Sequence, residues 1–454
     1  MLTDHESLLR KYNVAGPRYT SYPPVPYWDV NTFCQSAWMQ AIERASTDDP
    51  DGISLYIHLP YCESLCTFCG CNTRITVNHA VENSYIDAVL KEWELYINCM
   101  KKRPLIKELH LGGGTPTFFS AENLGRLIDG IKQHANVASD PAFGFEGHPA
   151  NTTALHLQTL YDLGFRRVSF GIQDFDPKVQ EVINRKQTSE QVQEITVHAR
   201  TIGYTSVNYD VLYGLPLQTL KNITNTMQRI IQLKPDRIAF YSYAHVPWIK
   251  PGQRKFTELD LPDDEVKRAL YDTGRILLEQ AGYREIGMDH FALQTDDLYI
   301  AFQNKKLHRN FMGYTTGHTN ILIGLGVSSI SELPGAYAQN VKTVEEYKEH
   351  IQASQIPVFK GHFLRREHRI IRQHILQLMC RMQTDWENPS NQCASLLTGI
   401  GSMAVMEKEG LVKIGLHRLE ITEKGRPFIR NICMALDPYI QNTQTMNNQF
   451  SKVI

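Results

Sequence analysis

The stretch SLYIHLPYCESLCTFCGC, residues 54–71, joins a short apolar run to a loop that carries four cysteines in ten positions. The run SLYIHLP is rich in apolar and β-branched residues and ends at a proline, which predicts a buried β-strand that stops there. The whole chain of 454 residues has nine cysteines, so this loop concentrates them. Three explanations fit such a group: a disulfide framework, a zinc site or an iron–sulfur cluster.

Length and composition argue against disulfides. A chain of 454 residues with 42% hydrophobic residues can bury a large core without covalent bridges. The N-terminal sequence MLTDHESLLRKYN is polar and charged, so we expect no secretory signal and a cytoplasmic protein whose thiols stay reduced. No apolar run is long enough to predict membrane insertion. The other cysteines stand singly and are expected to be small apolar or incidental residues: Cys34, Cys99, Cys380, Cys393 and Cys433.

The charge balance gives no sign of a polyanionic partner. Lys and Arg total 47, Asp and Glu total 48, and the formal net charge is -1. A nucleic-acid-binding or membrane-surface protein would be expected to carry a basic patch. We therefore expect a small-molecule partner and no nucleic acid.

From Ser54 onward, short strand-like runs alternate with longer amphipathic stretches, which is typical of an α/β protein with a parallel sheet. Helical periodicity between the runs supplies right-handed crossovers. The pattern predicts a partial (β/α)6 barrel of the TIM-like type, with its active site at the carboxyl ends of the strands. Six strands are predicted: 54–60, 107–114, 143–149, 167–173, 206–216 and 237–247. Glu146, Gln173, Asp210 and the glycines Gly112, Gly113 and Gly114 lie near those ends.

The remaining sequence predicts three further regions around a barrel of residues 51–290. Residues 1–50 form an N-terminal arm, whose segment 11–28 is rich in Pro, Gly and Tyr and is expected to be extended and packed over the surface. Residues 291–355 form a connecting segment near the substrate. Residues 356–454 predict a mostly helical C-terminal domain with a winged-helix-like end, interpreted as a cap on the barrel.

The cysteine spacing favours iron–sulfur over zinc. Zinc usually takes two separate CxxC knuckles or paired histidines, whereas Cys62-x3-Cys66-x2-Cys69 lies in one loop. Three thiolates can bind three irons of a 4Fe-4S cluster and leave the fourth iron open for a ligand. Cys71, two residues beyond Cys69, would have to reach across the same small cube, so we expect it to be a separate thiol with its own role.

These motifs resemble the radical S-adenosylmethionine (SAM) superfamily, through CxxxCxxC after a strand and GGGTP at 112–116. More narrowly, the chain resembles the oxygen-independent coproporphyrinogen III oxidase family from about Lys11 to Ile454. The fragments that carry the likeness are YIHLPYCESLCTFCGCN, LGGGTPTFF, FGIQDF, YDVLYGLP, IGMDHFAL, LHRNFMGYTT, GRPFIRNICMALD and FSKVI.

The resemblance implies a reaction and a set of cofactors. The 4Fe-4S cluster would be held by Cys62, Cys66 and Cys69, and SAM would chelate the fourth iron. One-electron cleavage of SAM would give a 5'-deoxyadenosyl radical that removes hydrogen from a propionate side chain, and loss of CO2 and one more electron would leave a vinyl group. Two propionates of coproporphyrinogen III would react in this way to give protoporphyrinogen IX in haem biosynthesis, with two SAM molecules bound.

The resemblance also implies roles for single residues. Cys71, Tyr56 and Glu146 are the candidate catalytic residues, and Cys71 would be required without binding the cluster. The implied cofactor contacts are Tyr56, Gly112, Gly113, Glu146, Gln173, Arg185, Asp210, Leu212, Ala244 and Ile330. Read without the resemblance, Arg185 would be a surface ion pair and Leu212, Ala244 and Ile330 would be core residues.

Two departures from the family pattern concern the substrate side. Gly147 and His148 follow Glu146 where the family more often has an apolar and an acidic residue, and Met312 replaces a frequent glutamine. Two alternatives therefore stay open: a haem-binding or haem-trafficking relative, against which Cys71 argues, and an enzyme acting on another tetrapyrrole.

Arg18 and Arg309 are candidate donors to propionates, each with an equal structural explanation. A monomer with an unidentified electron donor and acceptor completes the expectation.

Overall fold

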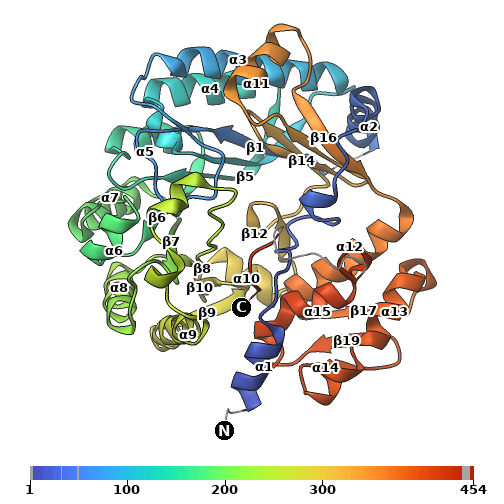
Figure 1. Ribbon diagram of the computed structural model, residues 1–454. Coiled ribbons are helices and arrows are strands. Elements are labelled where there is room, and N and C mark those ends of the chain that lie inside the picture. Colours follow the sequence, from blue (N-terminus) through green and yellow to red (C-terminus); the bar gives the residue numbers. More distant parts are fainter. Residues whose placement is uncertain (1–3, 32, 49–50, 442–449, 454) are drawn as a thin grey trace.

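The frame of the protein is one mixed β-sheet wrapped by helices (Figure 1). The computed structural model describes residues 4–31, 33–48, 51–441 and 450–453. Within these ranges, twelve strands form the large sheet in the order β16-β15-β14-β13-β1-β4-β5-β6-β7-β8-β10-β9. Three small sheets pair β2 with β3, β11 with β12, and β17 with β19 and β18.

All six predicted strands are present, and each is parallel to its neighbour. They are β1 (Ile53–Leu59), β4 (Leu105–Gly113), β5 (Asn136–Gly147), β6 (Phe165–Gln173), β7 (Ser206–Tyr213) and β8 (Arg237–Ser242). Every residue of β1 is buried, as expected for a central strand covered on both faces. The α/β prediction is confirmed, and β13 (Ile321–Leu325) adds a parallel strand on the other side of β1.

Antiparallel strands extend the sheet at both sides of this parallel centre. Strands β9 (Tyr283–Gly287) and β10 (His290–Leu293) form a hairpin next to β8, and β14 (Ile330–Leu333), β15 (Ala336–Asn340) and β16 (Val358–Phe363) follow β13. The connections β9–β10, β13–β14 and β14–β15 are too short for a crossover helix, so these strands return antiparallel, whereas helix α11 (Val344–Gln352) lies between β15 and β16. Much of segment 291–355 therefore belongs to the same sheet as the barrel strands.

Helices cover the outer face of the parallel strands (Figure 1). Helix α4 illustrates why these segments are helical: Ser120 caps it by accepting from Asn123 N, and Leu124, Leu127, Ile128 and Ile131 recur at helical spacing and are buried. The outer helices are α3 (Val81–Cys99), α4 (Ala121–Gln133), α5 (Ala154–Asp162), α6 (Pro177–Val182), α7 (Ser189–Ile202), α8 (Leu220–Leu233), α9 (Asp264–Gln280) and α11 (Val344–Gln352).

The C-terminal region packs with residues of the N-terminal arm and of strands β9 and β10 in a second hydrophobic core. It contains β17 (Gln383–Asp385) and a hairpin, β18 (Val412–Ile414) with β19 (Arg418–Ile421). Its helices are α12 (Arg366–Arg381), α13 (Ala394–Ser402), α14 (Ala404–Lys408), α15 (Ile429–Ala435) and α16 (Pro438–Gln441). Helix α10 (Asp297–Gln303) contributes to the same core.

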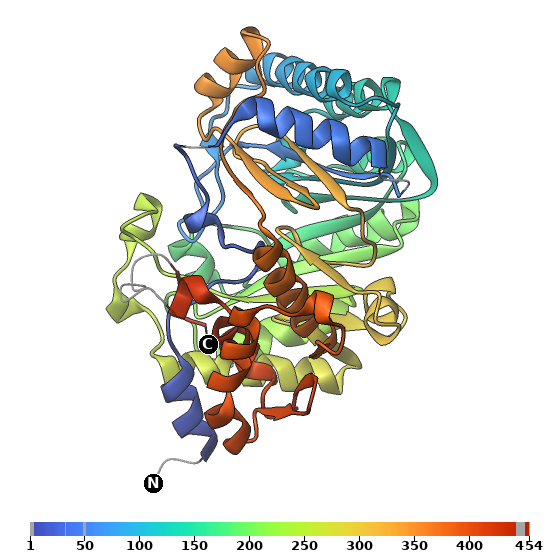
Figure 2. The ribbon, with the colours of Figure 1, turned by 90° about the vertical axis from the view of Figure 1, so that its right-hand side faces the viewer.

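The N-terminal arm connects the sheet to the C-terminal helices (Figure 2). Helices α1 (Asp4–Tyr12) and α2 (Gln35–Asp48) flank a stretch of little regular structure, in agreement with an extended arm. Its aromatic residues are buried rather than laid over the surface: Tyr19 is 2%, Tyr22 1% and Trp28 4% exposed. Apolar rings of this size gain more from burial than from solvation, so the arm forms part of the core. Among the described residues, the helices are too short or too polar to cross a lipid bilayer.

Candidate active site

The cysteine loop follows β1 and is held in place by two neighbouring segments. Strand β2 (Tyr61–Cys62) pairs with β3 (Arg74–Ile75), which closes the loop at its base. Near its far end, Thr67 N donates to Ile183 O at 3.0 Å and Asn184 Nδ2 donates to Leu65 O at 2.8 Å. Lys250 Nζ donates to Cys71 O at 3.0 Å from the other side. Hydrogen bonds to the backbone of the loop, two of them from side chains, therefore hold it from two sides.

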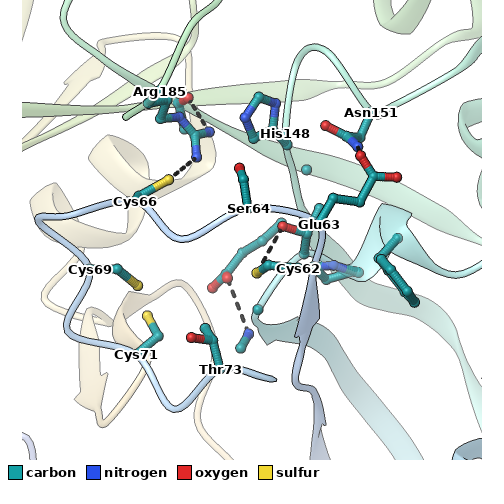
Figure 3. Close-up of a pocket in the computed structure, with 18 of the residues that line it drawn as sticks. Cys62, Glu63, Ser64, Cys66, Cys69, Cys71, Thr73, His148, Asn151 and Arg185 are labelled. Atoms are coloured by element: carbon teal, nitrogen blue, oxygen red, sulfur yellow. Dashed lines mark hydrogen bonds between the residues drawn. The ribbon is translucent and has the colours of Figure 1, made fainter. Parts of the chain in front are cut away.

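The four cysteine side chains of the loop line one pocket (Figure 3). Cys62 Sγ lies 3.4 Å from Thr115 Oγ1, and Arg185 Nη1 donates to Cys66 Sγ at 3.7 Å. The sulfurs of Cys69 and Cys71 point toward each other. The structure thus brings Cys62, Cys66 and Cys69 to a common space, with Cys71 beside Cys69.

The pKa values of the Cys69 and Cys71 thiols are shifted in opposite directions. The Cys71 thiol donates a hydrogen bond to Cys69 and, together with the backbone at Cys71 and the charge of Lys250, lowers the pKa of Cys69 despite burial. The same hydrogen bond, followed by burial, raises the pKa of Cys71. Burial raises the pKa of Cys62 to about 11 and, opposed by Arg185, also raises the pKa of Cys66. The hydrogen bond between the two side chains therefore favours the thiolate form at Cys69 and the thiol form at Cys71.

The glycine run at the end of β4 is enclosed by the side chains around it. A Cβ at Gly112 would lie 2.9 Å from Glu146 Oε1 and 3.0 Å from Tyr56 Cε2. Gly113 has φ +113°, and a Cβ there would lie 2.7 Å from the His58 ring. Glycine is required at these positions because the backbone passes so close to its neighbours. The result is a narrow floor beneath the cysteine pocket.

Two carboxylates face the pocket from β5 and β7. Glu146 accepts from Gly113 N at 3.3 Å and lies 3.4 Å from His110 Nε2. Burial raises the pKa of Glu146, but His110, Gly113 N–H and His58 outweigh it and lower the pKa overall. Asp210 accepts from Ser169 Oγ at 3.0 Å and Asn208 Nδ2 at 2.8 Å, while burial and the charge of Glu146 raise its pKa to about 6. The wall therefore has two acidic groups with different proton affinity.

The part of the wall at the carboxyl ends of β5 and β6 carries Gln173, Arg185 and His148. Gln173 has a positive φ of 66°, a strained conformation that turns the chain at the carboxyl end of β6. Arg185 Nη2 donates to Gly171 O at 2.6 Å, and its buried Nε has no partner within the described residues. His148 Nδ1 accepts from Ala150 N at 3.1 Å, and burial followed by the charge of Arg185 lowers its pKa to about 3. The departure at His148 thus places a neutral imidazole in this wall.

Tyr56 lies beneath the pocket and does not line it. Its hydroxyl donates to His58 Nδ1 at 3.2 Å, because His58 Nε2 already donates to Asn72 O at 2.8 Å. Its ring is parallel to His110 and meets Phe311 edge-on at 4.9 Å. Four other predicted contacts also lie outside the lining: Gly112 is enclosed by Glu146 and Tyr56, Leu212 packs in a small apolar cluster, Ala244 O accepts from Gln253 Nε2, and Ile330 borders Gly324 on β13.

The sequence reasoning missed His58, His110 and Ser169. A signal for them exists in the period-two alternation of the strands. Tyr56 and His58 on β1, His110 and Gly112 on β4, and Ser169 and Gly171 on β6 each recur at every second residue. A polar residue repeated on one face of a buried strand indicates an inner barrel wall, which composition alone does not show.

The donor set fits an iron–sulfur cluster and SAM. Each thiolate of a 4Fe-4S cluster binds a different iron, so three thiols around one space match it, whereas within the described residues no three His, Cys, Asp or Glu side chains are placed to share a single metal ion. The free Nε of Arg185 suits a carboxylate, and Glu146 and Asp210 suit an ammonium or hydroxyl groups. The pocket can therefore hold both groups side by side.

Comparison with known proteins agrees with this donor set. Residues 56–230 match the family model of the Radical SAM superfamily. The oxygen-independent coproporphyrinogen III oxidase of Escherichia coli K12 is 37% identical over 99% of this chain and 98% of its own length. The chain belongs to the oxygen-independent coproporphyrinogen III oxidase family. The family's enzymes of Helicobacter pylori J99 and Pseudomonas aeruginosa are each 36% identical over 98% of this chain and 98% of their own lengths.

The fold agrees with that of a solved member of the family. The structure of coproporphyrinogen III oxidase from Escherichia coli, described as a radical SAM enzyme, superposes with a TM-score of 0.89 at 36% identity. The match covers 93% of this chain and 97% of that one. The superposition therefore extends well beyond the barrel, and the family's radical SAM fold is confirmed.

Proposed function

We propose that this chain oxidatively decarboxylates two propionate side chains of coproporphyrinogen III to vinyl groups, giving protoporphyrinogen IX. Each conversion releases CO2, two electrons and a proton. The observation that carries the proposal is that Cys62, Cys66 and Cys69 share a pocket with Glu146, Arg185 and Asp210, in a chain that matches the named relatives over nearly its whole length.

In this proposal the three cysteines hold the 4Fe-4S cluster and leave one iron for SAM. When bound, the cluster and SAM supply the one-electron chemistry and the hydrogen abstraction that the reaction needs. Arg185 offers its free Nε to the SAM carboxylate, and the enclosed floor at Gly112 and Gly113 positions SAM against Glu146. Asp210 binds hydroxyl groups of the nucleoside part, and the buried walls exclude water.

Cys71 has a role apart from binding the cluster. Its side chain lies beside Cys69 in the pocket, and we assign it a part in electron or hydrogen transfer. Tyr56 and Glu146 are the other two proposed catalytic residues, and both would contact SAM. A second SAM molecule completes the proposal, supported by the family matches at Gln173, Arg185 and Asp210, and Leu212, Ala244 and Ile330 are proposed as further cofactor contacts. We expect a cytoplasmic monomer that exchanges electrons with a separate donor and acceptor.

The deciding experiment is anaerobic. The protein is reconstituted with iron and sulfide, reduced, and mixed with SAM and coproporphyrinogen III while vinyl product and 5'-deoxyadenosine are followed together. Formation of both in step supports the decarboxylase. If 5'-deoxyadenosine appears without vinyl product, the cluster chemistry stands and a different substrate must be sought, with the departures at Gly147, His148 and Met312 as the first suspects. Tight haem binding with neither product would instead favour the haem-trafficking alternative.

A further inference from the structure

The hairpin of β11 (His308–Asn310) and β12 (Gly313–Thr315), near the centre of Figure 1, carries the buried residue Arg309. At the tip of the hairpin, Phe311 meets the Tyr56 ring edge-on at 4.9 Å. Tyr56 in turn borders Gly112, next to Glu146. Arg309, two residues before Phe311, is thereby placed beside the cofactor pocket without belonging to its wall.

Arg309 is buried with unused hydrogen-bond donors. The residue is 5% exposed, and its guanidinium lies 4.7 Å from the centre of the Tyr314 ring. Nη2 donates to Arg18 O at 3.3 Å, but Nε and Nη1 are buried with no partner within the described residues. A buried charged group with unsatisfied N–H groups is unfavourable, and such groups are normally paired. The free donors therefore point to a ligand with acceptor oxygens.

The surroundings of Arg309 hold more cations than anions. Asp289, in the turn between β9 and β10, is the carboxylate at the centre, and Arg18 Nη1 lies 3.5 Å from its Oδ2. Arg430 and Lys267 also act on Asp289, although Arg430 is committed to backbone carbonyls of the arm and C-terminus, and Lys267 donates to Tyr243 O. One carboxylate thus faces four cationic side chains in a buried setting, where an additional anion is favoured.

This cationic group adjoins the cofactor pocket through Tyr241. The Tyr241 hydroxyl donates to His290 Nε2 at 3.1 Å, since His290 Nδ1 donates to Met288 O at 2.8 Å. The charge of Asp210, which lines the pocket, raises the pKa of Tyr241, and the charges of Arg18 and Arg309 lower it. A ligand too large for the pocket alone could therefore reach from the cofactors to Arg309.

We propose that Arg309, assisted by Arg18, forms a subsite that binds the carboxylate of one propionate of the tetrapyrrole. The inference rests on the proposed function, because a tetrapyrrole with four propionates is the ligand whose size and charge fit. The guanidinium supplies the donors, Arg18 supplies a second positive charge, and Asp289 holds Arg18 in position. Arg309 is a substrate-positioning residue here, since it lies away from the cysteines.

The test compares binding of coproporphyrin III with binding of its uncharged tetramethyl ester. Fluorescence titrations are run on the wild-type reconstituted protein, Arg309→Met, Arg309→Lys and a control, Arg268→Met. Arg268 also lies over a tyrosine ring, at 5.1 Å from Tyr271, but its guanidinium is already paired with Asp272. The preference is the ratio of the dissociation constant for the ester to that for the tetracarboxylate. We expect this ratio to be about 10- to 100-fold larger for wild type and the control than for Arg309→Met.

The unfolding temperature is a second measurement. If Arg309 had only a structural role, replacing it by Met would lower this temperature. Because the free protein buries unsatisfied N–H groups at Arg309, we expect Arg309→Met to unfold at the wild-type temperature or above. Arg309→Lys keeps a charge with fewer donors and should show an intermediate preference. If Arg309→Met does not fold, the test rests on Arg309→Lys. A folded variant, Met or Lys, that prefers the tetracarboxylate over the ester as strongly as wild type would overturn the subsite.

The outcomes separate this inference from the proposed function. If wild type shows the charge preference, and Arg309→Met loses it, but no vinyl product forms in turnover, the subsite stands and the decarboxylase proposal fails. If vinyl product forms while Arg309→Met keeps the wild-type preference, the subsite is wrong and the proposed function is unaffected.

Discussion

Arg185 bridges the cysteine loop and the carboxyl end of β6, donating from Nη1 to Cys66 Sγ at 3.7 Å and from Nη2 to Gly171 O at 2.6 Å. Its Nε stays free at the pocket. We predict that Arg185→Lys, which keeps the charge but loses the fork of donors, weakens SAM binding about tenfold or more and leaves the iron content unchanged. Equilibrium dialysis with SAM measures this, with exposed Arg229→Lys as the control. An unchanged dissociation constant for SAM would remove Arg185 from the site.

The four cysteines of the loop are predicted to divide into ligands and a non-ligand. Cys62→Ala, Cys66→Ala and Cys69→Ala should each lose the cluster, seen as loss of visible absorbance and of bound iron and sulfide, together with all activity. Cys71→Ala should keep the cluster and lose turnover, because the other three cysteines of the pocket are the proposed ligands and the Cys71 side chain lies beside Cys69. A Cys71→Ala protein without a cluster would refute this division of roles.

The narrow floor at Gly112 predicts a specific effect of a single methyl group. In Gly112→Ala the new Cβ would press on Glu146 and Tyr56, and overpacking of this kind costs about 1–3 kcal/mol. We expect SAM to bind roughly tenfold more weakly or worse. Gly401→Ala, where no atom lies within 4 Å of the added Cβ, is the matched control and should bind SAM normally. Equal affinity in both variants would contradict the role of this floor.

The buried arm predicts a loss of stability on truncating Trp28. Its ring stacks on Tyr337 at 5.1 Å, its Nε1 donates to Pro23 O at 2.9 Å, and it is 4% exposed. Trp28→Ala should lower the free energy of unfolding by about 3–5 kcal/mol. Trp248, 53% exposed, provides the control, and Trp248→Ala should change it by about 0.5 kcal/mol or less. Chemical denaturation measures both, and equal losses would show that the arm does not contribute to the core.

Glu92 predicts a pH-dependent contribution to stability. It accepts from Gly326 N, Tyr347 Oη and Asn340 Nδ2 at 2.7 Å each, yet burial outweighs these bonds and raises its pKa from 4.5 to about 7. The folded state thus binds a proton more tightly than the unfolded state. Stability from this group is fully present below pH 4.5 and is lost as the pH rises toward 7, by about 2–3 kcal/mol between pH 5 and 8.

The measurement for Glu92 is the difference in unfolding free energy between pH 5 and pH 8. Glu92→Gln cannot ionise, so it should lack this part of the pH dependence, while the other carboxylates cancel in the comparison with wild type. The amide replaces an oxygen that accepts from Asn340, so a lower stability at pH 5 is also expected. The same pH dependence in both proteins would mean that Glu92 titrates normally.

The sequence by itself determined the parts of this protein that depend on local pattern. The six parallel strands follow from short apolar runs and the helices between them, since a period of two or of 3.6 residues is a property of neighbouring side chains. The placement of Cys62, Cys66 and Cys69 in one loop after β1 follows from their spacing, and the family motifs supplied Glu146, Arg185 and Asp210 as candidates that the structure brings to one pocket.

Only the tertiary structure decided the features in which distant segments meet. The arm residues Tyr19 and Trp28 are buried because the C-terminal region and β15 cover them, and no local pattern predicts that. His58 and His110 became part of the site because β1 and β4 pair in one register. Arg309 is left with free donors by the joint packing of the arm, the β9–β10 turn and its own hairpin. Burial and the pairing of charges depend on which chains come together in space, so they emerge only when the whole chain is folded.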